Sequence, residues 1–452
     1  MTNLAVSPYM RPMFPVRRDL SELLRLAVPV IGSRLGVMAM GLTDTVVVGR
    51  YSSRELGYMA LGLTPTAVVM VAAMGLLTGV QVMTARRLGE GRPDEAGFVL
   101  RRGISYALLV SLAATALLLA FGPMFLHAVG VGADLADGSS RVLVVFTLSI
   151  GTSILGVVLS SWLEASSRPG EAMAAMWAAN GVNLALDLVL VPGRFGLHAF
   201  GASGAGWSTF IARAVMVAAL AVLIARTPAG RRALLVKPPR DRSAEAVQRG
   251  IGYGAGIAFF VEAGAFSAMN VVAGWVGGLA VAGWAIVLNV ASLIFMVPLG
   301  VATATSVLVA RAYGAGDPAG MRRAGLLGFA VAGFAAAVVS LLVWPGADLI
   351  AGAYATDAAL IEMVRAALVL ACRFFIADAL QVVGAQALRA CGDIRLSTAV
   401  QVASYAAVML PLGWALALPF GLGLSGIVWA VIAASLMSAA LLLTRFAAVA
   451  RG

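Results

Sequence analysis

Charged residues are scarce in this chain of 452 residues. Asp, Glu, Lys and Arg make up 12% of it, whereas hydrophobic residues make up 61%. An ordinary soluble domain has about 25% charged and about 45–50% apolar residues, so the composition excludes a soluble globular protein. It indicates a protein that crosses a membrane many times.

Histidine and cysteine are almost absent, with two residues of each. His127 and His198 fall at the ends of predicted spans, and no Ser/His, HExxH or Cys/His constellation accompanies them, which disfavours an enzyme. Cys372 and Cys391 lie along or just beyond one predicted helix, about 28 Å apart at 1.5 Å per residue, too far for a disulfide. No GxxxxGK[ST] motif is present, so nothing in the sequence indicates ATP binding.

Long apolar stretches are abundant instead. Each covers about 20 residues or more, enough for a helix to cross a hydrocarbon core of about 30 Å. The alternating segments of about 10 residues that form membrane β-barrels do not occur. We predict an all-α integral membrane protein with twelve transmembrane helices. The predicted spans are 24–48, 56–84, 103–127, 141–163, 172–193, 201–225, 250–275, 279–309, 324–346, 358–388, 397–419 and 423–447.

The placement of the basic residues explains the net charge of +11. Most of the 32 Lys and Arg residues fall on one side of the twelve-span arrangement, and only Arg50, Arg54, Arg141 and Arg194 fall on the other. Cytoplasmic loops of membrane proteins carry such an excess, so we expect both termini in the cytoplasm and no nucleic-acid partner. Residues 1–23 show no cleavable signal.

One half of the chain repeats the other. Residues 85–93 (ARRLGEGRP) return at 310–318 as ARAYGAGDP, a spacing of 225 residues, and LEA at 163–165 returns as LRA at 388–390. Widely spread matches at one spacing indicate an internal repeat. Further along, the spacing becomes 222, as between Gly204 and Gly426 and between Trp207 and Trp429.

Parallel repeats with an even number of spans place two lobes about an axis along the membrane normal. We therefore predict two pseudo-symmetric six-helix lobes joined by the most polar segment of the chain. The predicted parts are a cytoplasmic segment at 1–23, an N-lobe at 24–225, a cytoplasmic linker at 226–249 and a C-lobe at 250–447.

Besides Glu362 in the first turns of the tenth predicted span, four carboxylates fall inside the predicted spans. A charge at the bilayer centre costs about 2.5–3.5 kcal/mol, so these acids need partners, water or a substrate. None is required by the repeated scaffold, because the repeat-related positions carry no acid. The acids are Asp44, Asp187, Glu262 and Asp378, and their counterparts are Met269, Leu412, Val37 and Ser153. A structural role stays open, because four arginines within spans could neutralise some of them: Arg34, Arg213, Arg365 and Arg373.

The fifth predicted span carries Asn180, Asn183 and Asp187 on one helical face. With Asp44 and Thr209 from other spans, this face offers hard oxygen ligands for a small cation or a proton. Asn residues alone on a membrane helix more often form hydrogen bonds between helices.

In the other half, Asp378 and Gln381 share one face of the tenth span, and Glu262 is available from the seventh. A buried carboxyl without a fixed countercharge can exchange protons at physiological pH. The same oxygens could also bind Na⁺, so the sequence leaves the choice of ion open.

At these residues the chain resembles the MATE family, and within it the NorM-like bacterial multidrug branch. The resemblance covers essentially the whole chain and is carried by LAVPVIGS at 26–33, MGLTDTVVVG around Asp44, NLALD, GASGAGWSTFIAR, LNVASLIFMVPLG around Asn289 and ADALQVVGAQALRACGD around Asp378. It implies an exporter of small cationic amphipathic drugs, driven by inward Na⁺ or H⁺ flow, with no other cofactor. It also implies a monomer in a bacterial inner membrane.

The resemblance also implies roles for individual residues. Ion coupling falls to Asp44, Asn183, Asp187, Thr209, Glu262 and Asp378, with the first four forming a Na⁺ site if Na⁺ is the ion. Contacts with substrate are expected at Asn180, Asn289, Phe374 and Gln381. Two departures stand out, because NorM-like proteins often have Tyr at the position of Phe374, and Arg34 stands where a small or apolar residue is expected.

These features favour antiport by alternating access. The alternative is a lipid-linked saccharide flippase of a related fold, which would line its cavity with several Arg or Lys for a pyrophosphate, whereas only four Arg fall within spans away from their ends. A membrane-embedded enzyme and a channel are further alternatives. The unduplicated acids and the two-lobed repeat favour a pump over a channel.

Overall fold

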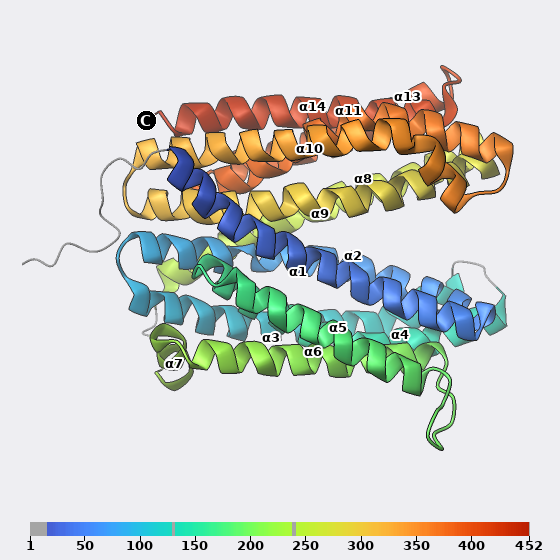
Figure 1. Cartoon of the computed structure of the whole chain (residues 1–452), viewed down its shortest axis with the longest axis horizontal. Coiled ribbons are helices and arrows are strands. Elements are labelled where there is room, and N and C mark those ends of the chain that lie inside the picture. Colours follow the sequence, from blue (N-terminus) through green and yellow to red (C-terminus); the bar gives the residue numbers. More distant parts are fainter. Residues whose placement is uncertain (1–15, 129–131, 237–240, 452) are drawn as a thin grey trace, which may run out of the picture. The chain divides into compact units, whose positions relative to one another are not determined.

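The computed structural model describes residues 16–128, 132–236 and 241–451, and these residues form helices without a strand. Arg11, Lys237 and Arg240, among the cations predicted to be cytoplasmic, lie outside the described residues, as does most of the predicted 1–23 segment. The helices (Figure 1) are α1 (Val16–Tyr51), α2 (Ser53–Gly89), α3 (Pro93–Ala128), α4 (Ala133–Ala165), α5 (Pro169–Leu190), α6 (Ala202–Ala225), α7 (Pro228–Leu235), α8 (Arg242–Val276), α9 (Gly278–Gly314), α10 (Pro318–Tyr354), α11 (Ala358–Ala390), α12 (Ile394–Val402), the π-helical turn η1 (Ala403–Met409), α13 (Leu410–Ala417) and α14 (Gly423–Val449).

Twelve helical segments among the described residues are long and apolar enough to cross a membrane, with α12, η1 and α13 together forming the eleventh. This confirms the twelve predicted spans. Most of the helices extend several residues beyond the predicted apolar stretches. Polar residues such as Arg86, Glu164 and Arg389 therefore belong to the helices themselves.

The chain forms two compact units. The N-unit comprises residues 32–84 and 92–252, and the C-unit comprises residues up to 31, 85–91 and residues from 253 onward. Helices α1, α2 and α8 contribute to both units. The lobe boundaries drawn from the sequence stay a prediction.

The nine-residue repeat builds the same turn twice. Helix α3 begins at Pro93 and α10 begins at Pro318, because a proline at the first helical position has a suitable φ and gives up no hydrogen bond. Just before them, Gly91 and Gly316 adopt left-handed φ values of 72° and 64°, which favour glycine. The repeat is therefore structural.

In the N-unit, α4 packs against α3 and α6, and α5 packs against α6. Small residues allow this close approach, since a Cβ on Gly62 would lie only 2.7 Å from the backbone oxygen of Ser139. Backbone carbonyls of α1 accept hydrogen bonds from Trp177 and Asn180 of α5. Polar side chains of α1, α5 and α6 can thus meet inside this unit.

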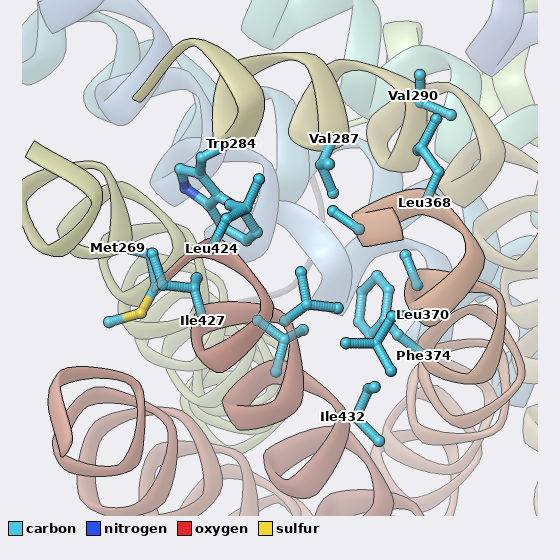
Figure 2. Packing of buried hydrophobic residues seen from close by; sticks show 14 of the residues in the cluster. Met269, Trp284, Val287, Val290, Leu368, Leu370, Phe374, Leu424, Ile427 and Ile432 are labelled. Carbon is cyan, nitrogen blue, oxygen red and sulfur yellow. The ribbon is translucent and has the colours of Figure 1, made fainter. Parts of the chain in front are cut away.

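In the C-unit, α11 is the central helix and packs against α9, α10 and α14. Figure 2 shows an apolar cluster of the C-unit that includes residues of α11. In this cluster Met269, Trp284 and Phe374 pack with Leu424 and Ile427. The eleventh span is interrupted by η1, whereas its repeat partner α5 is a regular helix.

Candidate functional site

Four polar residues meet inside the N-unit, and we call them the Asp44 cluster: Asp44 on α1, Asn183 and Asp187 on α5, and Thr209 on α6. The Thr209 hydroxyl donates a hydrogen bond to Asp44 Oδ2 (2.8 Å), and Asn183 Nδ2 donates one to Asp44 Oδ1 (3.0 Å). All four residues are buried. The structure therefore brings together the set that the sequence grouped as one site.

Asp187 completes this cluster with a second carboxyl group. It lies near both Asp44 and Ser208. Neither of its oxygens, nor Oδ1 of Asn183, is in hydrogen-bonding geometry with a donor among the residues that the structure describes. Two neighbouring buried carboxylates repel each other when both are charged, so the cluster needs a proton or a cation.

Arg213 on α6 supplies one positive charge to this region. Its Nη1 donates a hydrogen bond to Ser153 Oγ (2.5 Å), and its charge attracts Asp44. With both acids ionised, one net negative charge is left in the region. That charge suits a single monovalent cation.

Asn180 makes a different contact. Its Nδ2 donates a hydrogen bond to the Gly36 backbone oxygen of α1 (2.9 Å). Such a contact between helices is typical of Asn in membrane helices. Asn180 therefore helps to hold α5 against α1, one turn from the Asp44 cluster.

Arg34 pairs with none of the four acids identified from the sequence. Its Nη2 lies 3.3 Å from Oε2 of Glu164, a buried acid of α4. Glu164 was not among the predicted buried acids, because the predicted apolar stretch ends at residue 163, whereas α4 continues to residue 165. Arg365 pairs with the exposed Glu362, and Arg373 is exposed.

A second group, which we call the Glu262 cluster, lies in the C-unit. It consists of Glu262 on α8 with Asp378 and Gln381 on α11. Gln381 Nε2 donates hydrogen bonds to Glu262 Oε1 and to Asp378 Oδ1, both at 3.2 Å. One buried amide thus bridges the two acids that the sequence assigned to the C-lobe.

Three side chains that the sequence analysis missed extend this cluster. Gln401 of α12 donates a hydrogen bond to Gln381 Oε1 (3.3 Å) and accepts one from Arg389 Nη2. Tyr405, in the π-helical turn, is buried next to Glu262. Such turns are frequent at functional sites. The arginine of LRA was a signal that could have identified Arg389, but no motif marked Gln401.

Phe374 lines an apolar pocket beside the Glu262 cluster. Its ring centroid lies 6.2 Å from that of Phe266, which lies 6.4 Å from Trp284 and 6.0 Å from Tyr405. Figure 2 labels Phe374 and Trp284 in this cluster. The pocket is small, with a volume of about 10 Å³, and its lining is entirely apolar and aromatic. The residues that line the pocket are Phe266, Trp284, Val287, Leu288, Ala291, Ala371, Phe374, Val428 and Val431.

The repeat shows that the two units carry different chemistry on related helices. Asp44 corresponds to Met269 at a spacing of 225, and Thr209 corresponds to Val431 at a spacing of 222. Met269 and Val431 both belong to the apolar cluster of the C-unit. An acidic site in one half thus corresponds to an apolar wall in the other.

Asn289, expected to contact substrate, is exposed on α9. Its Oδ1 accepts a hydrogen bond from the Tyr354 hydroxyl (2.8 Å). The structure therefore gives Asn289 a partner on α10 and not within the Glu262 cluster.

No group of three or more His, Cys, Asp or Glu side chains with metal-binding geometry occurs among the described residues. The Asp44 cluster offers two carboxylates, one amide and one hydroxyl. The Glu262 cluster offers two carboxylates and one amide. A monovalent cation or a proton fits such sites better than a divalent metal ion, which prefers more carboxylates.

Known proteins with similar sequences carry multidrug resistance names. The chain is 52% identical over 437 residues to the probable multidrug resistance protein NorM of Caulobacter vibrioides, across 96% of this chain and 93% of that protein. It is 33% identical over 437 residues to NorM of Bradyrhizobium diazoefficiens, across 95% and 93%. It is 30% identical over 406 residues to the multidrug resistance protein PmpM of Pseudomonas aeruginosa, across 89% and 85%.

The MatE sequence family matches the chain twice, at residues 29–189 and 255–415, once in each half of the repeat. Among solved structures, the outward-facing conformation of a multidrug resistance MATE family transporter of the MOP superfamily has the same fold. The TM-score is 0.86 at 18% identity, across 96% of this chain and 97% of that chain.

Proposed function

The chain belongs to the MatE family, whose members are membrane transporters and not enzymes, and on this premise we propose that it exports cationic amphipathic drugs in exchange for inward Na⁺ or H⁺. The relatives named as multidrug resistance proteins support the substrate class. The single observation that supports ion coupling best is the Asp44 cluster, in which two buried carboxyl groups meet at positions that the repeated scaffold does not duplicate.

Opposed binding of ion and drug gives the exchange its direction. A cation that binds the acids from outside lowers the affinity of the protein for a cationic drug, and its release inside restores that affinity. By linkage, the drug lowers the affinity for the coupling ion to the same extent. The ion gradient then drives drug export through alternating access.

The two clusters divide the work in this proposal. Asp187 and Asn183 supply buried oxygens without donors, as a Na⁺ ion requires. At the Glu262 cluster, Gln381 already donates to both acids, and the apolar pocket of Phe374 lies alongside. We therefore assign Na⁺ to the Asp44 cluster, and protonation or contact with the drug to the Glu262 cluster. Each cluster is complete within one chain, which agrees with a monomer.

The central experiment measures uptake of ethidium into everted vesicles while a proton gradient and a Na⁺ gradient are imposed separately. We expect at least one gradient to accelerate ethidium movement, and the effect to disappear when that gradient is collapsed. Movement that is indifferent to both gradients contradicts ion-coupled export.

A binding experiment tests the assignment of Na⁺. Isothermal titration of the purified protein with NaCl should show Na⁺ binding that is lost in Asp187→Asn and kept in Asp378→Asn. The reverse pattern would place Na⁺ in the Glu262 cluster and refute the division of roles.

A further inference from the structure

The repeat relates two pairs that each contain one arginine and one fully buried member. In the N-unit, Arg34 of α1 forms an ion pair with Glu164 of α4 (3.3 Å). The positions 225 residues later are Phe259 of α8 and Arg389 of α11. There the guanidinium carbon of Arg389 lies 5.4 Å from the centroid of the Phe259 ring. Arg389 thus stands at the position of the acid Glu164, and Phe259 stands at the position of Arg34.

Arg389 is therefore a buried cation without an adjacent carboxylate of its own. Its side chain is fully buried, and Nε and Nη1 have no hydrogen-bond acceptor among the described residues. A cation–π contact contributes a few kcal/mol at most, much less than burying an isolated charge costs. The compensating negative charge must come from elsewhere in the C-unit.

The Glu262 cluster supplies that charge. Glu262 lies one helical turn after Phe259 on α8, and its charge attracts Arg389. Hydrogen bonds also connect the two groups: Arg389 donates to Gln401, Gln401 donates to Gln381 (3.3 Å), and Gln381 donates to Glu262 (3.2 Å). Arg389 is thus connected to the cluster through buried amides.

We propose that Arg389 is the internal countercharge of the Glu262 cluster, and that it limits the cluster to one monovalent cationic group at a time. Glu262 and Asp378, when ionised, carry two negative charges, and Arg389 leaves one net negative charge. A proton or a drug with one cationic group then completes neutrality, whereas a dication leaves an excess positive charge. Arg389 would thus set substrate charge without touching the substrate, as a positioning residue.

This inference rests on the proposed function, in which the Glu262 cluster contacts the drug. Ethidium and propidium test it, because they share a phenanthridinium ring and propidium carries a second quaternary ammonium group. Their dissociation constants for the purified protein are measured by fluorescence anisotropy. In Arg389→Gln, we expect the affinity for propidium relative to ethidium to rise roughly tenfold over that of the unaltered protein.

Three further variants separate charge from packing. Arg389→Lys keeps the charge and should keep the ratio of the unaltered protein. The double variant F259R/R389E rebuilds the ion pair of the N-unit and removes the countercharge. It should raise the affinity for propidium relative to ethidium by as much as is expected for R389Q. This variant tests the proposal also in the case that R389Q does not fold. The double variant R34Q/E164Q removes a neutral pair in the other unit and should leave the ratio unchanged.

The outcomes distinguish this inference from the proposed function. If the unaltered protein binds ethidium and neither R389Q nor F259R/R389E shifts the ratio, the countercharge role is wrong. A shift of equal size in R389K, or loss of binding of both dyes in the folded variants, also contradicts it. If the unaltered protein binds neither dye, the proposed function itself fails.

Discussion

At the scale of single residues, the proposed coupling role of Asp44 can be tested by neutralising its side chain. Its two oxygens accept hydrogen bonds from Asn183 and Thr209. An asparagine at this position would turn one acceptor into a donor. The Thr209 hydroxyl can accept that hydrogen bond, because a hydroxyl both donates and accepts.

Asp44→Asn should therefore insert into the membrane normally and lose drug export. We expect ethidium efflux from cells to fall at least about tenfold at matched expression, because a neutral amide can neither exchange a proton nor bind a cation strongly in a buried site. Asp134→Asn is the matched control, since Asp134 forms an exposed ion pair with Arg54 and surface pairs contribute little. Efflux by Asp44→Asn equal to that of the control would contradict a coupling role.

The thiol of Cys391 gives a prediction about chemical reactivity. Burial raises the pKa of its thiol to about 12. The reactive thiolate is then about one part in ten thousand at pH 8, since a thiol reacts only after losing its proton. Cys372 is buried as well. Incubation of the folded protein with a maleimide at pH 8 should add no mass within minutes, and denaturation should allow two additions. Rapid single labelling of the folded protein would show that Cys391 is accessible.

At the scale of helices, two repeat-related glycines allow the ends of α2 and α9 to cross within the C-unit. A Cβ on Gly89 would lie 2.1 Å from the backbone oxygen of Arg311, and a Cβ on Gly314 would lie 2.2 Å from that of Arg86. Both obstacles are backbone atoms, which cannot move aside as a flexible side chain can. The two helices contact each other through their main chains, as small residues permit in membrane proteins.

Gly314→Ala should therefore separate the two helices and destabilise the protein. Overpacking of this kind costs about 1–3 kcal/mol, so we expect the thermal unfolding midpoint of the purified protein to fall by about 2–5 °C. Gly346→Ala is the control, because open space surrounds Gly346 within α10 and alanine favours a helix. Its midpoint should stay the same or rise. Equal midpoints for the two variants would show that the crossing tolerates a methyl group.

At the scale of the whole molecule, the distribution of Lys and Arg predicts the orientation of the chain. Twelve spans predict that both termini lie on one side of the membrane and that the loop between α5 and α6 lies on the other. The excess of basic residues predicts that the termini are cytoplasmic in the bacterial inner membrane.

Reporters test this orientation. Green fluorescent protein fused after residue 452 should fluoresce, and alkaline phosphatase at the same position should be inactive. An epitope tag inserted after Gly196, which has open space around it, should bind antibody from the periplasmic side in permeabilised cells. Active alkaline phosphatase at the C-terminus would reverse the orientation.

The sequence by itself determined the number of spans, the internal repeat and the shared helical face of Asn183 and Asp187. Each apolar stretch long enough to cross a bilayer is recognised from its own residues, without reference to the rest of the chain. Asn183 and Asp187 share a face because of helical spacing alone. A buried acid without a repeat counterpart, such as Asp44, is visible because the two halves can be compared.

The tertiary structure decided which distant helices present their polar faces to one another. Only packing shows that Arg34 pairs with Glu164, or that Gln401 connects Arg389 to Gln381 across two helices. Hydropathy and helical period describe each segment alone, whereas these contacts depend on the rotation and crossing of several helices. The charge of the Glu262 cluster is therefore set by α8, α11 and α12 together.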